Sequence, residues 1–171
     1  MPLHRLFVPK GLYTPSDKVA LAQAITTVYQ LIPKFYVVVL FIELESKDFF
    51  VGGNTTDRMV RISVEHLARN FSECVICISL PSLYCLLLIY RLAAHSDAAK
   101  RGFMDRYETA LAPFTKARGI DWEVQVTDCD RLLWNINGMA PPQGNSEEEK
   151  IWKRENRAVT AEEMEVLKRR L

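Results

Sequence analysis

Several features that would assign a function at once are missing from the sequence. Lys and Arg number 22 against 21 Asp and Glu, so a formal net charge of +1 leaves no basic surplus for nucleic acid or an anionic membrane surface. The four cysteines lack the spacing of a disulfide framework. No basic start followed by an apolar stretch marks a secretory signal. We therefore expect a cytoplasmic protein that does not bind nucleic acid.

The bulk composition is that of an ordinary globular protein. The chain has 171 residues, which predicts one domain and is enough to bury a sizeable core. Hydrophobic residues make up 49% and charged residues 25%, as in a typical soluble fold.

The first forty residues follow a strand-helix-strand pattern. Residues 2–8 form a short apolar strand, and Thr14 with Pro15 predicts the start of a helix. Apolar residues then recur at helical spacing until Pro33, where we expect the helix to end. Residues 35–43 are almost entirely β-branched and aromatic, which is typical of a strand buried on both faces. This order predicts a right-handed β-α-β unit with parallel strands.

The second half repeats the pattern. Residues 59–64 alternate as a strand does, and a short strand and turn precede them at 49–54. Phe103, Tyr107, Leu111 and Phe114 have helical spacing, with Gly119 as the expected stop, and residues 122–126 alternate again. We interpret this as a second β-α-β unit that shares one sheet with the first. Capping signals then predict two short, charged helices at about 147–157 and 161–170.

One uncharged stretch, residues 74–90, does not fit this pattern. It is near the lower length limit for a membrane span, so a membrane-associated protein anchored through 74–90 is one interpretation, and a buried or inserted segment is the favoured one. Cys74 and Cys77 have a metal-like spacing, but no second ligand pair exists. We interpret them as small hydrophobic residues and predict no metal and no cofactor.

Met1 and Pro2 open the chain with a group of potential chemical interest. Removal of Met1 would leave a proline with a free secondary amine. A free α-amine titrates at about 7.7–8.0, and apolar surroundings lower that value, so it suits general acid or base catalysis at neutral pH. The alternative is a plain terminus in which Pro2 only starts an edge strand.

Six stretches in their order and spacing resemble the tautomerase superfamily, in particular its cis-3-chloroacrylic acid dehalogenase-like branch. They are Met1–Leu3, Leu12–Ser16, Phe35–Gly53, Glu65–Arg69, Gly102–Val126 and Leu132–Pro142. The resemblance implies an α+β fold in which two fused β-α-β units share a mixed four-stranded sheet with helices on one face. It further implies a homotrimer, a domain over residues 1–142 and a helical extension over 143–171.

The resemblance also implies a site. Pro2 matches the family's catalytic proline, and Arg69 matches the first of two arginines that hold a substrate carboxylate, a task suited to a planar guanidinium. Ser72 stands where the second arginine is expected. Tyr29 stands in place of a substrate-binding histidine, although core packing is the favoured explanation of an aromatic residue there. Asn135 is the nearest counterpart of a water-activating glutamate.

These departures narrow the chemistry that we expect. Without the glutamate, dehalogenation and hydration lose their water-activating base. Proton transfer next to a carbonyl needs only Pro2 and an anchor for the carboxylate. We therefore predict a tautomerase acting on a small keto-enol or unsaturated carboxylate. The alternative is a catalytically degenerate oligomer with the same fold. His4, on the same strand face as Pro2, and Arg58 and Arg61, on a later strand, are weaker candidates for the site.

Residues 73–96 interrupt the family pattern. Joining residues 69–72 directly to 97–100 restores one continuous amphipathic helix. We interpret the segment as an insertion, either genuine or a translated, unspliced intron. A genuine insertion would lie next to Arg69.

Overall fold

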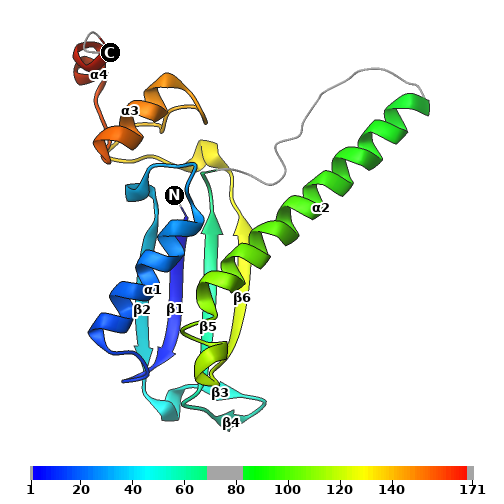
Figure 1. Cartoon of the computed structure of the whole chain (residues 1–171), viewed down its shortest axis with the longest axis vertical. Coiled ribbons are helices and arrows are strands. Elements are labelled where there is room, and N and C mark those ends of the chain that lie inside the picture. Colours follow the sequence, from blue (N-terminus) through cyan, green and yellow to red (C-terminus); the bar gives the residue numbers. More distant parts are fainter. Residues whose placement is uncertain (1, 69–82, 169–171) are drawn as a thin grey trace.

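The computed structural model describes the backbone of residues 2–68 and 83–168, and the side chains of residues 2–68 and 97–168. Its centre is a four-stranded sheet in the order β2-β1-β5-β6 (Figure 1). The strands are β1 (Leu3–Pro9), β2 (Val38–Leu44), β5 (Met59–His66) and β6 (Asp121–Asp128). β1 is parallel to β2, β5 is parallel to β6, and the two pairs meet where β1 runs antiparallel to β5.

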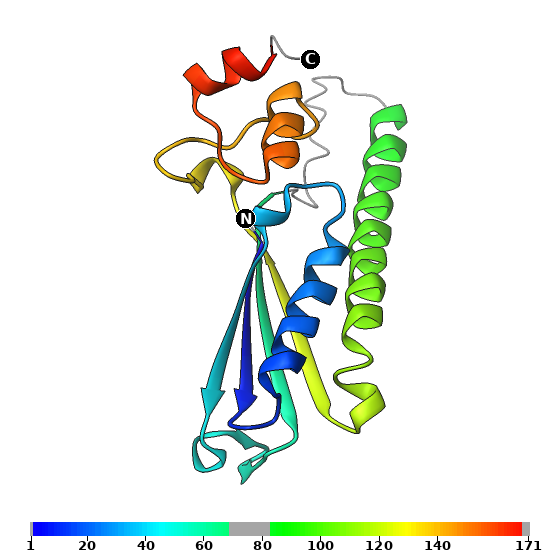
Figure 2. The ribbon, with the colours of Figure 1, turned by 60° about the vertical axis from the view of Figure 1, so that its left-hand side comes forward.

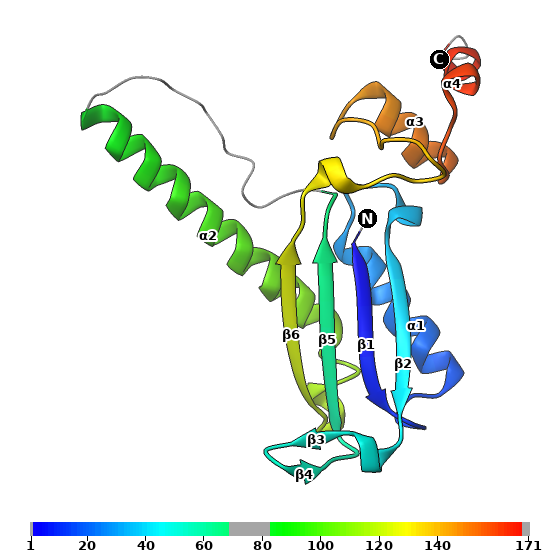
Figure 3. The same ribbon diagram turned by 180° about the vertical axis from the view of Figure 1, so that it is seen from behind.

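Two helices link the parallel strands. α1 (Pro15–Val28) connects β1 to β2, and α2 (Leu83–Leu111) precedes β6. Both lie on the same face of the sheet, and no described helix covers the other face (Figure 2). The amino-terminal part of α2 extends past the β6 edge (Figure 3). The predicted α+β fold, with two β-α-β units in one mixed sheet and helices on one face, is thereby confirmed.

Alternation along the strands places the core between the sheet and these helices. Leu6 and Val8 of β1 and Val60, Ile62 and Val64 of β5 are fully buried on the helical side. The intervening residues of both strands are only half-buried, because the face on which they lie is uncovered. The alternation of apolar residues along β1 and β5 therefore identifies the sheet face on which α1 and α2 pack.

The elements between β1 and β5 depart from the sequence prediction in two ways. α1 ends at Val28 rather than at Pro33, and residues 34–36 form a 3-10 turn, η1 (Lys34–Tyr36), before β2 begins at Val38. β2 is also not buried on both faces: it is an edge strand with one uncovered face, and Leu40 is 44% exposed. Its continuous apolar run therefore does not reflect burial within a single chain.

The remaining connections are short. A 3-10 turn, η2 (Ser46–Asp48), leads into the predicted turn region, where β3 (Phe50–Val51) and β4 (Asn54–Thr55) form a small hairpin. α2 ends at Leu111, ahead of Pro113. Gly119, with φ of +63°, instead terminates a 3-10 turn, η3 (Lys116–Arg118), so it does not end the helix as predicted.

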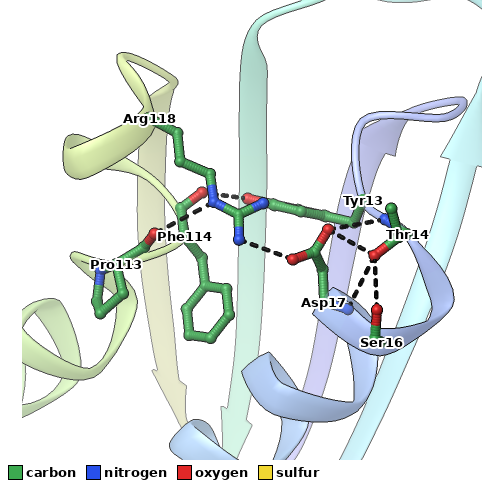
Figure 4. A network of polar contacts seen from close by, with 7 residues as sticks. All are labelled: Tyr13, Thr14, Ser16, Asp17, Pro113, Phe114 and Arg118. Atoms are coloured by element: carbon green, nitrogen blue, oxygen red, sulfur yellow. Dashed lines mark hydrogen bonds and ion pairs between the residues drawn. The ribbon is translucent and has the colours of Figure 1, made fainter.

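A polar network joins the two halves at the amino end of α1 (Figure 4). Thr14 and Asp17 form a capping box, and the Asp17 carboxylate accepts a 2.7 Å hydrogen bond from Arg118. The Tyr13 hydroxyl donates to the carbonyl of Phe114 at 2.9 Å. The hydrogen bonds from Arg118 and Thr14 hold the pKa of the Asp17 carboxyl well below its usual range, so the pair stays charged at neutral pH.

The end of the chain packs over the opposite end of the sheet. After a 3-10 turn, η4 (Arg131–Leu133), come α3 (Glu147–Glu155) and α4 (Ala161–Lys168). Trp152 of α3 is buried against Phe35 and Tyr36 of η1. The side chain of Asn156 accepts a hydrogen bond from the Phe35 amide at 3.0 Å. The short connection between α1 and β2 therefore takes much of its packing from α3.

Candidate functional site

Pro2 is a buried residue at the end of the sheet where several elements converge. Its carbonyl accepts a 3.0 Å hydrogen bond from the amide of Val38 at the start of β2. On the other side, the pairing of Leu3 with Glu65 puts Pro2 next to His66, the last residue of β5. Pro2 therefore lies between the beginning of β2 and the end of β5.

Five aromatic and imidazole rings pack together beneath this end of the sheet. They come from both β-α-β units and are His4, Tyr29, His66, Phe103 and Tyr107. His4 stacks on Tyr107 with ring centroids 5.6 Å apart and meets Tyr29 edge-on at 5.4 Å. Tyr29 in turn lies 6.0 Å from His66. We call these five side chains the ring cluster.

His4 is held as a neutral imidazole within the ring cluster. It is completely buried, and its Nδ1 is 2.8 Å from the Tyr107 hydroxyl. Burial, assisted by the proximity of His66, lowers the pKa of His4 from 6.5 to about 3. Burial also raises the pKa of Tyr107 well above its usual value. Both members of this hydrogen bond are therefore uncharged at neutral pH.

Tyr29 is the polar group of the cluster that is best placed to interact with a ligand. It caps the carboxyl end of α1 and is 8% exposed, and its hydroxyl has no hydrogen-bond partner among the residues that the structure describes. Burial raises its pKa far above that of a free phenol, so the hydroxyl keeps its proton. An unpaired buried donor is costly, and a ligand oxygen would remove that cost.

Tyr29, His66 and Phe103 also line a groove between the carboxyl end of α1 and α2. Its volume is about 940 Å³. The other lining residues come almost entirely from the two helices and the turn after α1: Ala24, Thr27, Val28, Gln30, Leu31, Ile32, Ala99, Asp105, Arg106, Thr109 and Ala110. The groove is therefore mainly apolar, with a few polar groups along it.

The residues predicted from the sequence are only partly brought together. Tyr29 lines the groove, and His4 is buried behind it. Arg69 lies outside the described residues, as does Ser72. Asn135 is an exposed residue of the loop that follows η4 and does not line the groove.

The two weaker arginine candidates have structural partners elsewhere. Arg58 donates to the carbonyls of Arg118 and Gly119 at the far end of β5. Arg61 pairs with Glu123 and Gln125 across the uncovered face of the sheet. Through these contacts both arginines stabilise the pairing of β5 with β6 and the turn that precedes β6.

The structure adds three ring-cluster residues that the sequence did not single out as functional: His66, Phe103 and Tyr107. The signal was present in the alternation of β5, because His66 continues the buried positions Val60, Ile62 and Val64. Phe103 and Tyr107 were recognised only as helical core positions. Their proximity to His4 depends on how α2 crosses the sheet.

No group of three or more His, Cys, Asp or Glu within the described residues is arranged to hold a metal ion. Among the described helices, none combines the length and apolar character needed to cross a membrane. Part of the segment 74–90, with Cys74 and Cys77, lies outside the described residues.

Comparison with known proteins agrees with this α+β architecture. Residues 1–75 and 85–157 match a family described as "Putative oxalocrotonate tautomerase enzyme". The unmatched residues 76–84 lie within the segment that we interpret as an insertion. No curated protein sequence matches the chain.

Solved structures support the same assignment. A probable enzyme from the thermophilic fungus Aspergillus fumigatus is 38% identical, with a TM-score of 0.74, over 94% of this chain and 97% of that one. Both the family match and this structure cover most of the chain, including both β-α-β units, so together they identify the class of protein. The chain belongs to the tautomerase superfamily, as the resemblance predicted.

Two more distant structures share the fold. A member of the cis-3-chloroacrylic acid dehalogenase family is 15% identical, with a TM-score of 0.56, over 90% of this chain and 97% of that one. A fused 4-OT, described as an asymmetric trimer, is 17% identical, with a TM-score of 0.53, over 81% of this chain and 94% of that one.

Because His4 is buried as a neutral imidazole, we expect it to make the stability of the protein depend on pH. The unfolded chain protonates His4 below pH 6.5, whereas the folded protein resists protonation down to about pH 3. Its contribution to stability is therefore complete above pH 6.5 and is lost as the pH falls toward 3. Between pH 7.5 and 4.5, His4→Phe should lose less unfolding free energy than the wild type, by on the order of 2 kcal/mol.

Urea denaturation at the two pH values measures this difference. Tyr107→Phe is the matched control, because it removes the hydrogen bond but keeps the imidazole, and it should retain the wild-type pH dependence. An equal loss of stability in His4→Phe and the wild type would show that His4 does not titrate as described.

Proposed function

We propose that this protein is a tautomerase that uses Pro2, freed by removal of Met1, to transfer protons on a small keto-enol carboxylate. The observation that carries the proposal is Tyr29. Its buried hydroxyl lacks a partner among the described residues, and Tyr29 lines the same groove as His66, the residue next to Pro2 in the β1–β5 register. Membership of the tautomerase superfamily supports the same assignment.

The proposed step needs an amine base and a hydrogen-bond donor. The Pro2 nitrogen accepts the proton from the carbon next to the carbonyl, and the C–H electron pair becomes the C=C bond of the enol. The C=O π pair moves onto the oxygen, which is hydrogen-bonded by Tyr29 and takes a proton from water. The hydroxide that remains takes the proton from the Pro2 ammonium, which restores the free amine. The reverse sequence returns the keto form. Tyr29 suits this role because its raised pKa keeps it a donor rather than a phenolate.

Arg69 remains our proposed anchor for the substrate carboxylate on the basis of the family resemblance. It follows Ala68, which is buried at the end of the described segment after β5. Asn135 is retained as a weaker proposal, since its exposed loop position does not join it to Tyr29. The reaction requires no metal or cofactor.

The role of Pro2 is tested at the amino terminus itself. The mechanism needs a free Pro2 nitrogen, because a nitrogen in a peptide bond with Met1 has no basicity. Intact mass spectrometry should therefore show that Met1 is absent. Pro2→Ala should lower kcat/KM for phenylpyruvate ketonisation at least about tenfold, since a flexible primary amine replaces the fixed ring nitrogen. An amino-terminal extension that leaves Pro2 in a peptide bond should abolish turnover.

Covalent labelling by 3-bromopropionate is a second test of whether Pro2 has a free, nucleophilic nitrogen. It should modify Pro2 in the processed wild type and not in the extended chain. Full turnover by the extended chain would rule out the proline mechanism. A processed wild type with neither turnover nor labelling would instead identify a degenerate oligomer.

The role of Tyr29 is tested by removing its hydroxyl alone. Tyr29→Phe keeps the ring contacts with His4 and Phe103 but loses the donor to the enolate oxygen. We expect kcat to fall about 10- to 100-fold with little change in melting temperature. Tyr13→Phe is the control: its hydroxyl bonds Phe114 in the polar network of Figure 4, so kcat should stay unchanged. Equal kcat values for Tyr29→Phe and the wild type would remove Tyr29 from the mechanism.

We further propose that the protein is a homotrimer in which the uncovered sheet face is buried. On the β1–β2 half of that face the register aligns Leu3 with Val38, Arg5 with Leu40 and Phe7 with Ile42, so this half is mainly apolar. The β5–β6 half is polar, with Arg61 paired to Glu123 and Gln125. The trimeric assembly of the fused 4-OT, which has the same fold, supports this proposal.

Light scattering should give a mass three times that of the chain. Leu40→Glu places a charge on the open face and should yield monomers, because burying it would be costly. Val19→Glu is the control, since Val19 is 57% exposed on α1, away from that face, and the trimer should persist. A wild type that runs as a monomer would contradict the proposal.

A further inference from the structure

His66 lies next to Pro2 and Tyr29, the two residues that act in the proposed proton transfer. The pairing of Leu3 with Glu65 aligns Pro2 with His66, and residues aligned in this way point to the same face of the sheet with Cβ atoms about 4.5–5.5 Å apart. The centroid of the His66 ring is 6.0 Å from that of Tyr29, and both residues line the groove. The imidazole is therefore beside Pro2 on the face that a ligand in the groove would reach.

A carboxylate lies on the other side of His66. The register of the parallel strands aligns His66 with Asp128, the last residue of β6. Val124 and Val126, at alternate positions of β6 before Asp128, pack against the core on the helical face, so the alternation puts Asp128 on the same face as His66. When the terminus is free, an amine, an imidazole and a carboxylate thus follow one another across the sheet, from Pro2 to His66 to Asp128.

The two imidazoles of the ring cluster differ in whether they can exchange protons at neutral pH. Histidine is the side chain that ordinarily suits this task, because its usual pKa is about 6.5. Burial lowers the pKa of His4 to about 3, so this residue stays neutral. His66 borders the groove and has Asp128 beside it, and a carboxylate favours the charged form of a neighbouring imidazole. Proton exchange next to Pro2 therefore falls to His66.

We infer that His66 carries the proton that leaves Pro2 in the proposed step, and that Asp128 positions the imidazole and stabilises its charged form. A ring nitrogen of His66 takes the proton from the Pro2 ammonium, which breaks the ammonium N–H bond and restores the free amine. The imidazolium then gives a proton to the hydroxide that remains after water has protonated the enolate oxygen, so water and neutral imidazole are regenerated. This inference rests on the proposed function, because it assigns a residue to one step of that reaction.

The kinetics of phenylpyruvate ketonisation by two variants of the full chain test the role of His66. His66→Phe keeps a ring against Tyr29 and Phe103 but cannot exchange a proton. We expect its kcat to fall about 100-fold with little change in KM, since general acid–base catalysis contributes factors of this size. His66→Gln, which can form hydrogen bonds but does not titrate, should lose as much. Wild-type kcat in His66→Phe would overturn the inference.

Added imidazole separates proton transfer from packing. His66→Ala opens a space at the groove that free imidazole can enter, and saturating imidazole should raise its kcat at least about tenfold. Tyr29→Phe is the matched control: it changes the same groove but retains His66, so imidazole should not raise its kcat. A folded His66→Ala that does not respond to imidazole would overturn the inference. If circular dichroism shows that His66→Ala is unfolded, the kcat values of His66→Phe and His66→Gln still decide the question.

Asp128→Asn tests the positioning role of the carboxylate. It should lower kcat about tenfold in the wild type but have no effect in His66→Phe, because the carboxylate acts only through the imidazole. Asp121→Asn is the control, since Asp121 is also exposed but lies at the opposite end of β6, and its kcat should stay unchanged. Equal losses from Asp128→Asn in both backgrounds would contradict the role given to Asp128.

The Pro2 variants distinguish a failure of this inference from a failure of the proposed function. Turnover that depends on Pro2 but not on His66 would contradict the inference alone. A wild type without Pro2-dependent turnover would contradict both. Turnover that is lost in Pro2→Ala and in His66→Phe, with recovery of His66→Ala by imidazole, would support both.

Discussion

The antiparallel pairing of β1 with β5 is the contact on which the site depends. Each β-α-β unit contributes one of these strands, so this single register fixes how the two units face each other. It aligns Leu3 with Glu65, which puts Pro2 next to His66, and an ion pair of 2.5 Å between Arg5 and Glu65 reinforces it on the open face. A slip of one residue would turn His4 and His66 out of the core and dissolve the ring cluster.

The β1–β5 pairing matters for the candidate site because it assembles the ring cluster. Phe and Leu could occupy these positions if only packing mattered. Instead, His4, Tyr29 and Tyr107 bring polar atoms into a buried space. The hydrogen bond between His4 and Tyr107 satisfies two of those atoms. His4 Nε2 and the Tyr29 hydroxyl remain buried without a partner among the described residues. Buried polar groups retained at such a cost are typical of binding sites.

The sequence predicted the parts of the fold that depend on local pattern. The alternation of Val60, Ile62 and Val64 identified β5, and Thr14 with Pro15 located the start of α1, because strand pleating and helix capping are short-range effects. The burial of β2 was predicted wrongly, since an apolar run does not reveal whether its cover comes from the same chain. His66 was missed because its place in the ring cluster depends on the residues that pack against it from α1 and α2. Arg69 and Asn135 came from resemblance. Arg69 lies outside the described residues, and Asn135 does not line the groove with Tyr29.

The contact between Phe35 and Asn156 joins residues 121 positions apart in the chain. Tyr36, next to Phe35, is buried against Trp134 and Trp152, so the turn that follows Tyr29 acquires its packing from residues made late in synthesis. Contacts of such long range close slowly, because the intervening chain must first be ordered. A growing chain can thus assemble its sheet and α1 before the turn after Tyr29 reaches its final packing. On a ribosome, this protein would form its sheet before the turn beside Tyr29 is fixed in place.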